Sequence, residues 1–190
     1  MLWNMTMVLL SRRRVVVVAI KLNCGCVKLA LPNGHVVDIL TPVLDELTKW
    51  LQGDPDTPES GGYIVGYEHK DTGNVVLERI SVPARLDRQT RTHFDMLDPA
   101  HKVFLLKEKM HKSYYMGVWH THPQTTPIPS VTDWNDWRET LATDKTAAEY
   151  IFFLIAGTDN TRIWVGNPKD KTIVEILECP KLDDIYTKQQ

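Results

Sequence analysis

The segment GVWHTHPQTTPIPSVTDWNDW, residues 117–137, brings together several side chains that can bind a metal ion or move a proton. Its first residues are apolar and indicate a strand, and three prolines then interrupt the chain. The following residues, SVTDWNDW, have a helix-capping side chain at their start and indicate the first turns of a helix. A strand, a sharp turn and a helix in succession form the basic unit of an α/β fold.

Two histidines in this segment are separated by one residue. On a strand, residues i and i+2 point to the same face, so His120 and His122 project together. The prolines turn the chain so that the helix begins beside the end of the strand, with Ser130 as its cap and Asp133 in its first turn. Two imidazoles and one carboxylate leave the fourth position of a tetrahedral zinc ion open to water, which is typical of catalytic zinc sites.

Zinc lowers the pKa of a bound water from about 15.7 to roughly 7, but hydrolysis also requires a group that carries protons. A carboxylate in a partly desolvated pocket suits this task. Glu59 is the preferred candidate because it precedes Gly61 and Gly62, where the backbone can approach a ligand closely, and an apolar strand. Glu68, at the far end of that strand, is an alternative that the residues alone leave open.

Simpler interpretations exist for each feature. A His-x-His pair is often an ordinary pair of polar side chains, and Ser130 and Asp133 match a capping box that requires no catalysis. His93, His101 and His111 have no partner at ligand spacing, so we expect them to be helix or loop histidines. A single Cys-x-Cys pair at residues 24–26 supplies only two ligands and is expected to serve strand or loop packing.

Composition excludes several classes of function. The chain has 190 residues, 43% of them hydrophobic, which is enough for one domain with a substantial core. Its 22 basic and 24 acidic side chains give a net charge of -2, which does not favour nucleic acid as a partner. Three cysteines indicate a reducing compartment, so we expect a cytoplasmic protein.

The N-terminal residues are apolar but interrupted by charge. Arginines at positions 12–14 and Lys21 divide the apolar blocks into pieces far shorter than the roughly 20 residues that span a membrane. A long apolar core and a small-residue cleavage site, typical of a secretory signal, are also missing. We therefore expect residues 1–26 to be a cytosolic leader or an added edge strand.

The remaining chain alternates between strand and helix patterns. Asn33-Gly34 predicts a hairpin within residues 26–40, Thr41-Pro42 predicts a helix start with a hydroxyl cap, and Asp98-Pro99 predicts a second helix. In that second helix, Val103, Leu106 and Met110 recur at helical spacing. Further strands are predicted at residues 62–69, 74–82, 114–120, 149–157, 161–167 and 172–178. The predicted class is α/β, a mixed sheet with helices packed on it.

The chemical residues occur in an order that matches a known family. Glu59 in ESGGYIVG, His120 and His122 in GVWHTHP, and Ser130 and Asp133 in SVTD resemble the JAMM pattern of MPN-domain, or JAB-like, metalloproteases. The spacing fits in full, and the likeness covers roughly residues 40–178. The resemblance implies one zinc ion held by His120, His122 and Asp133, with Glu59 as general acid/base and Ser130 as the group that holds the oxyanion.

The resemblance also implies a domain plan, an activity and a partner. A single JAB/MPN domain would occupy residues 27–180, between an N-terminal segment at 1–26 and a C-terminal tail at 181–190. Active members cleave amide or isopeptide bonds, often after the C-terminal glycine of ubiquitin or a ubiquitin-like protein. The sequence is most similar to short bacterial deconjugases encoded beside ubiquitin-activating-like and ubiquitin-conjugating-like enzymes. These include the deconjugases of antiphage systems, in which the conjugated tail is the C-terminus of a nucleotidyltransferase (CD-NTase).

The implied partner is therefore a protein substrate with an extended C-terminal tail, and neither nucleic acid nor a membrane is expected. Three alternatives stay open: a peptidase that processes a sulfur-carrier protein, an inactive MPN scaffold module, and a DNA-repair relative. The complete set of ligands argues against the scaffold, and the near-neutral composition argues against DNA repair. A zinc deaminase is excluded because its His-x-Glu and Cys-x-x-Cys motifs are absent.

Overall fold

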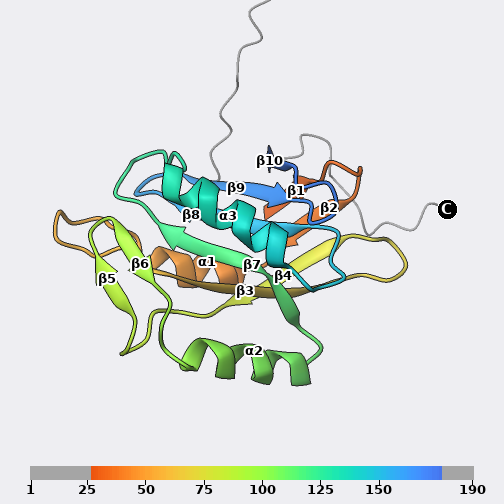
Figure 1. Cartoon of the computed structure of the whole chain (residues 1–190), viewed down its shortest axis with the longest axis horizontal. Coiled ribbons are helices and arrows are strands. Elements are labelled where there is room, and N and C mark those ends of the chain that lie inside the picture. The colour runs from red at the N-terminus through yellow and green to blue at the C-terminus, as the bar shows by residue number, and fades with distance from the viewer. Residues whose placement is uncertain (1–26, 177–190) are drawn as a thin grey trace, which may run out of the picture.

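The computed structural model describes residues 27–176, which form one large mixed sheet, a small two-stranded sheet and three helices (Figure 1). The strands of the large sheet are, in spatial order, β1 (Val27–Ala30), β2 (Val36–Ile39), β4 (Val75–Ile80), β3 (Gly61–Glu68), β7 (Tyr114–Thr121), β8 (Ile151–Ala156), β9 (Thr161–Gly166) and β10 (Ile173–Ile176). The β2–β4 and β7–β8 pairs are parallel and the other pairs antiparallel. The predicted α/β class is confirmed.

Helices cover both faces of this sheet. Alternate side chains of β8 point to opposite faces: Phe152 and Leu154 join the core that includes α1 (Thr41–Thr48), whereas Phe153 joins the core that includes α3 (Val131–Thr143). Every residue of β8 is buried, as expected for a strand covered on both sides. The α3 helix connects the parallel strands β7 and β8, so the loop that leads into it starts at the carboxyl end of β7.

The predicted hairpin and the first helix are present, with one difference at the helix start. β1 and β2 pair antiparallel around Asn33-Gly34, as the sequence predicts. The N-cap of α1 is Leu40, and no side chain caps this end, so the expected hydroxyl cap from Thr41 is wrong. Pro42 lies in the first turn, where a missing N–H costs nothing.

The second helix, α2 (Ala100–Met110), buries polar side chains, whereas the apolar side chains that recur at helical spacing are exposed. Val103, Leu106 and Met110 are 47%, 66% and 83% exposed. The buried residues are His101, which is bonded to other polar groups, and Glu108, which forms a 3.0 Å ion pair with Arg79. The apolar spacing therefore marks a helix correctly but does not mark its inner face.

A second hairpin was not predicted. β5 (Arg88–Thr90) and β6 (His93–Asp95) pair antiparallel and lie beside the carboxyl end of β7 (Figure 1).

None of the three helices in residues 27–176 has the length and apolar character needed to cross a membrane. The interpretations of residues 1–26, of the Cys24–Cys26 pair and of the tail at 181–190 concern residues outside the described range.

Candidate active site

The pairing of β3 with β7 brings Glu59 to the end of the histidine-bearing strand. Gly61 lies opposite His120 in the antiparallel register, and the backbone N–H of Thr121 donates to the carbonyl of Ser60 at 2.8 Å. Glu59 is the next residue back along the chain, and its side chain is buried, with the residue 7% exposed. A separation of some sixty residues in sequence is thus closed by one strand pair.

Packing of α3 returns Asp133 to the same place. Trp137 stacks on Phe153 with ring centroids 4.8 Å apart and an interplanar angle of 14°, which fixes the helix on the sheet. At the helix start, the Ser130 hydroxyl accepts from the backbone N–H of Asp133 at 3.1 Å. The Asp133 carboxylate accepts from the backbone N–H of Ser130 at 2.5 Å, which completes the capping box.

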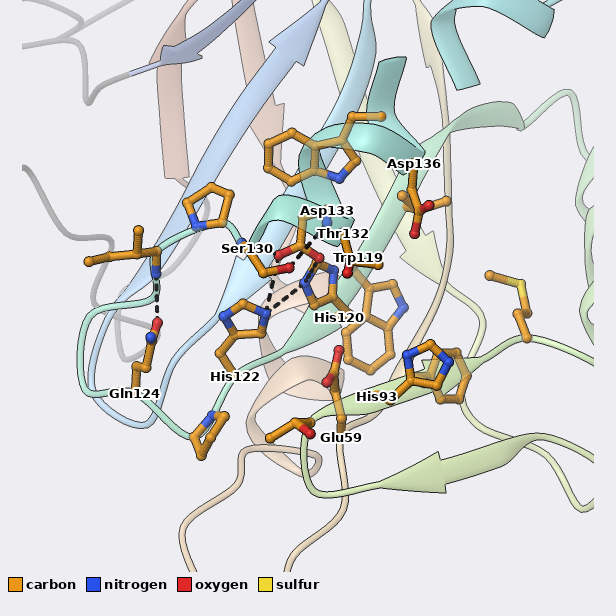
Figure 2. Close-up of a pocket in the computed structure, with 18 of the residues that line it drawn as sticks. Glu59, His93, Trp119, His120, His122, Gln124, Ser130, Thr132, Asp133 and Asp136 are labelled. Carbon is orange, nitrogen blue, oxygen red and sulfur yellow. Dashed lines mark hydrogen bonds and ion pairs between the residues drawn. The ribbon is translucent and has the colours of Figure 1, made fainter. Parts of the chain in front are cut away.

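The side chains of His120, His122 and Asp133 converge (Figure 2). The Nε2 atoms of the two histidines are 3.1 Å apart, and they lie 3.1 Å and 3.5 Å from the two Asp133 carboxylate oxygens. Donor atoms about 2.0 Å from a tetrahedral metal ion are separated by roughly 3.3 Å. The two nitrogens and the carboxylate oxygens therefore have the spacing of donor atoms around one such ion, and imidazole nitrogens with a carboxylate fit a divalent cation.

The electrostatic environment favours the metal-binding forms of the His122 and Asp133 side chains. Burial and the neighbouring charge of His120 lower the pKa of His122, which keeps that imidazole neutral and able to bind a metal. Burial alone would raise the pKa of Asp133, but hydrogen bonding and charge from His120, together with the hydrogen bonds to Ser130, lower it to about 2. Asp133 is thus ionised at neutral pH.

Glu59 lies next to the two histidines, and a carboxylate oxygen of Glu59 and one ring nitrogen from each of His120 and His122 lie within 4.8 Å of one another. Burial raises the pKa of Glu59 to about 7, with a further increase from Asp133 that His120 and His93 oppose. A carboxyl group that titrates near neutral pH and reaches the metal site directly or through one water is suited to proton transfer. Glu68 is exposed at the other end of β3 and does not line this site.

A cavity of about 670 Å³ opens over these residues, between the β5–β6 hairpin and α3. Its lining includes all five residues that the sequence singled out: Glu59, His120, His122, Ser130 and Asp133. Trp119, Phe94, Met96, Ile128 and Trp137 form much of the apolar wall. The site is therefore concave, largely apolar and centred on a small group of polar atoms, as ligand sites usually are.

Sequence reasoning missed two titratable residues of the cavity, His93 and Asp136. His93 lies on β6 rather than in a helix or loop, and its side chain lies near Glu59 in the cavity (Figure 2). Its Nε2 is 2.8 Å from Asp95. Burial raises the pKa of Asp136, as do the charges of Asp133 and Glu139. The sequence did not indicate that His93 lies in the cavity, because the hairpin that carries this residue was not predicted.

The two glycines after Glu59 have a different role from the one expected. A Cβ at Gly61 would lie 2.6 Å from a ring carbon of Phe94, and one at Gly62 would lie 2.2 Å from the carbonyl oxygen of Ser81. The close approach that these glycines permit is therefore made by the protein's own hairpin and strand rather than by a ligand. It lets the β5–β6 hairpin pack against the Glu59 segment.

A mixed sheet that brings two histidines, an aspartate and a buried glutamate to one cavity defines the site of a metal-dependent hydrolase. The family model described as prokaryotic homologs of the JAB domain matches residues 40–167, and the chain belongs to this family. The curated relatives include a CD-NTase/cGAS isopeptidase of Vibrio cholerae serotype O1, 31% identical over 75% of this chain and 88% of the relative. One of Escherichia coli (strain TW11681) is 30% identical over 70% of this chain and 82% of the relative.

These relatives confirm the predicted class, a deconjugating isopeptidase or peptidase of the JAB type. A solution structure of a Desulfitobacterium hafniense protein has the same fold, with a TM-score of 0.50 and 23% identity over 72% of this chain and 87% of that one.

Proposed function

We propose that the protein is a zinc-dependent isopeptidase that hydrolyses the amide bond after the last residue of a conjugated protein tail. One observation carries this proposal: the donor atoms of His120, His122 and Asp133 lie 3.1–3.5 Å apart beside a buried carboxylate, at the wall of a cavity. Three protein ligands with one open position are the arrangement of catalytic zinc.

His120, His122 and Asp133 would hold the ion, which when bound supplies the Lewis acidity that activates water and polarises the scissile carbonyl. Glu59 accepts the proton of the attacking water at a carboxylate oxygen and delivers it to the nitrogen of the leaving amine. The Ser130 hydroxyl accepts from the N–H of Asp133, and its hydrogen bonds to the Asp133 carboxylate. To act in the mechanism, this hydrogen turns from the carboxylate to the oxygen on which negative charge develops.

The substrate is inferred from the relatives. Both relatives described above are named CD-NTase/cGAS isopeptidases, and the match covers 82–88% of their lengths. We infer that this chain also releases a CD-NTase tail, or a ubiquitin-like one, from an amine to which it is conjugated. We also infer a cytoplasmic reaction, which the small number of cysteines supports, and a protein rather than a nucleic-acid partner, which the balance of charge supports.

The experiment uses a CD-NTase whose last residue is joined by an amide bond to a fluorescent protein. The protein, loaded with one equivalent of zinc, should release the fluorescent protein at that bond, as determined by mass spectrometry, and a zinc chelator should abolish the cleavage. Parallel fusions carrying a ubiquitin-like tail and a sulfur-carrier tail distinguish the alternative substrates. No cleavage of any tail by the zinc-loaded protein would contradict the proposal and favour a scaffold.

The matched variant is Glu59→Gln, which keeps the size of the side chain but cannot accept a proton. We expect the rate of cleavage to fall by about 10²- to 10⁴-fold, the usual contribution of general acid–base catalysis, while zinc remains bound. Near-normal turnover by this variant would remove Glu59 from the mechanism.

A further inference from the structure

Gln52, in the segment that follows α1, is a buried amide that contacts three separate parts of the site. The residue is 2% exposed. Its Nε2 donates to the carbonyl oxygens of Thr57 at 3.0 Å and Arg91 at 2.8 Å. Its Oε1 accepts from the hydroxyl of Thr121 at 3.3 Å. Both amide hydrogens and one oxygen lone pair are therefore used, which fixes the orientation of the side chain.

Two of these partners lie close in sequence to residues of the proposed mechanism, and the third lies in the hairpin that bonds to the Glu59 backbone. Thr57 precedes Glu59 by two residues, and Arg91 lies in the turn of the β5–β6 hairpin. Thr121, which is fully buried, lies on β7 between the two histidines, and its hydroxyl also accepts from the backbone N–H of Ser60 at 3.0 Å. Gln52 and Thr121 thus connect the segment before Glu59, the residue after it and the ligand-bearing strand.

The hairpin closes this network from the other side. The carbonyl of Thr90 accepts from the backbone N–H of Glu59 at 2.7 Å, and the side-chain amide of Gln89 donates to the carbonyl of Glu59 at 3.0 Å. Within residues 27–176, no side chain forms a hydrogen bond with the Glu59 carboxylate itself. The position of this carboxylate relative to the metal ligands is therefore set by how its backbone is held.

We propose that Gln52 and Thr121 are positioning residues. They hold Glu59 at the correct distance from the metal ion that His120, His122 and Asp133 would bind. This inference rests on the proposed function, because it assigns Gln52 and Thr121 a role in the proton transfer by Glu59. A displacement of about 1 Å at a reacting group can cost on the order of 10²-fold in rate, so loss of these bonds has a measurable effect even though neither residue touches the substrate.

The test removes the two bonds of the Thr121 hydroxyl while keeping its volume. Thr121→Val should lower kcat by about 10- to 100-fold on the CD-NTase fusion, with KM within twofold of the wild-type value and one equivalent of zinc retained. Thr121→Ser keeps the hydroxyl and should restore kcat to within threefold. Gln52→Met leaves the bond between Ser60 and Thr121 in place and should also lower kcat by about 10- to 100-fold. If Thr121→Val does not fold, the result for Gln52→Met tests the positioning role by itself.

The sharpest readout is the effect of the same changes in a Glu59→Gln background. If Thr121 and Gln52 act through Glu59, their substitution should lower the residual kcat by less than threefold once Glu59 cannot accept a proton. An equal loss of kcat in both backgrounds, loss of zinc, or an unchanged kcat in the wild-type background would each overturn the inference. An inactive wild-type enzyme would instead contradict the proposed function, so the two failures are distinguishable.

Discussion

Ser130 is a helix cap, and in the proposed mechanism it also donates to an oxyanion. Its hydroxyl oxygen accepts from the backbone N–H of Asp133, and the residue lines the cavity beside His120 and His122. A hydroxyl has one hydrogen and two acceptor lone pairs, so the hydrogen that bonds to the Asp133 carboxylate can turn to an oxyanion while the cap stays in place. The capping box also orients Asp133, because the same carboxylate that accepts from Ser130 reaches both histidines.

The two roles of Ser130 can be separated by substitution. Ser130→Ala should lower the free energy of unfolding by about 1 kcal/mol through loss of the cap and should also lower kcat. Ser130→Asp keeps a strong cap but has no hydroxyl to donate, so we expect wild-type unfolding by urea together with a kcat reduced by about 10²-fold. Full activity of the Asp variant would leave Ser130 with the capping role alone.

Asp133 allows a similar separation of metal binding from folding. Asp133→Asn retains a side-chain oxygen that can accept from the Ser130 N–H, but its uncharged amide is a poor metal ligand. We expect this variant to fold normally and to lose most of its zinc, as measured by elemental analysis of the dialysed protein. His120→Ala, which removes a ligand outside the cap, is the control and should lose zinc as well. Stoichiometric zinc in either variant would contradict the ligand assignment.

At the scale of elements, the strand β7 and the helix α3 were predictable because local rules determine them. A strand places i and i+2 side chains on one face, and Ser130-x-x-Asp133 is a capping box. The β5–β6 hairpin was not predictable for the opposite reason. Its strands have three residues each and are at least partly exposed along their length, so they show no apolar alternation. The position of Glu59 depends on the pairing of β3 with β7, which the residues around Glu59 do not encode locally.

In α2, the local sequence pattern predicts the helix but not the face that packs against the protein, and this difference can be tested. Its outer face carries Leu106, whereas its inner face carries Glu108, which is paired with Arg79. Leu106→Gln should change the free energy of unfolding by less than about 0.5 kcal/mol, because the side chain is 66% exposed. Glu108→Leu should lower it by up to about 1 kcal/mol, since the Arg79 side chain loses its partner but is 58% exposed and stays hydrated. Urea unfolding of both variants measures this difference, and the reverse order of effects would show that α2 packs through its apolar stripe.

Across the whole molecule, the cavity depends on how the segment 84–98 is fastened to the sheet. Asp87 accepts from the backbone N–H groups of Ala84, Leu97 and Asp98 at 2.7–2.8 Å and lies 2.7 Å from His101. His101 contacts the Ser81 hydroxyl at 2.8 Å in turn. One buried carboxylate thus joins both ends of the hairpin segment to His101 of α2, which in turn contacts the residue after β4, and the hairpin forms one side of the cavity.

Because of this arrangement, the free energy of unfolding depends on pH in the acidic range. Burial of Asp87 opposes ionisation, but the hydrogen bonds from Asp98, His101, Ala84 and Leu97 outweigh it and lower the pKa of the carboxyl. A carboxyl whose folded-state pKa is lowered stabilises the fold fully above its unfolded-state pKa, near 3.9. That stabilisation is lost as the pH falls below this value and through the folded-state pKa.

Asp87→Asn tests this directly, because the substituted amide turns two hydrogens toward groups that are themselves donors. At pH 7 we expect a loss of about 3 kcal/mol in the free energy of unfolding, the usual cost of removing one partner of a buried pair. Below about pH 4 the difference from the wild-type protein should shrink, because the carboxyl of Asp87 in the unfolded wild-type chain then takes up protons, which removes the stabilisation of the folded state. Urea unfolding at pH 7, 5 and 3 measures both effects. A difference that stays constant over this range would show that the bonds of Asp87 do not depend on its ionisation.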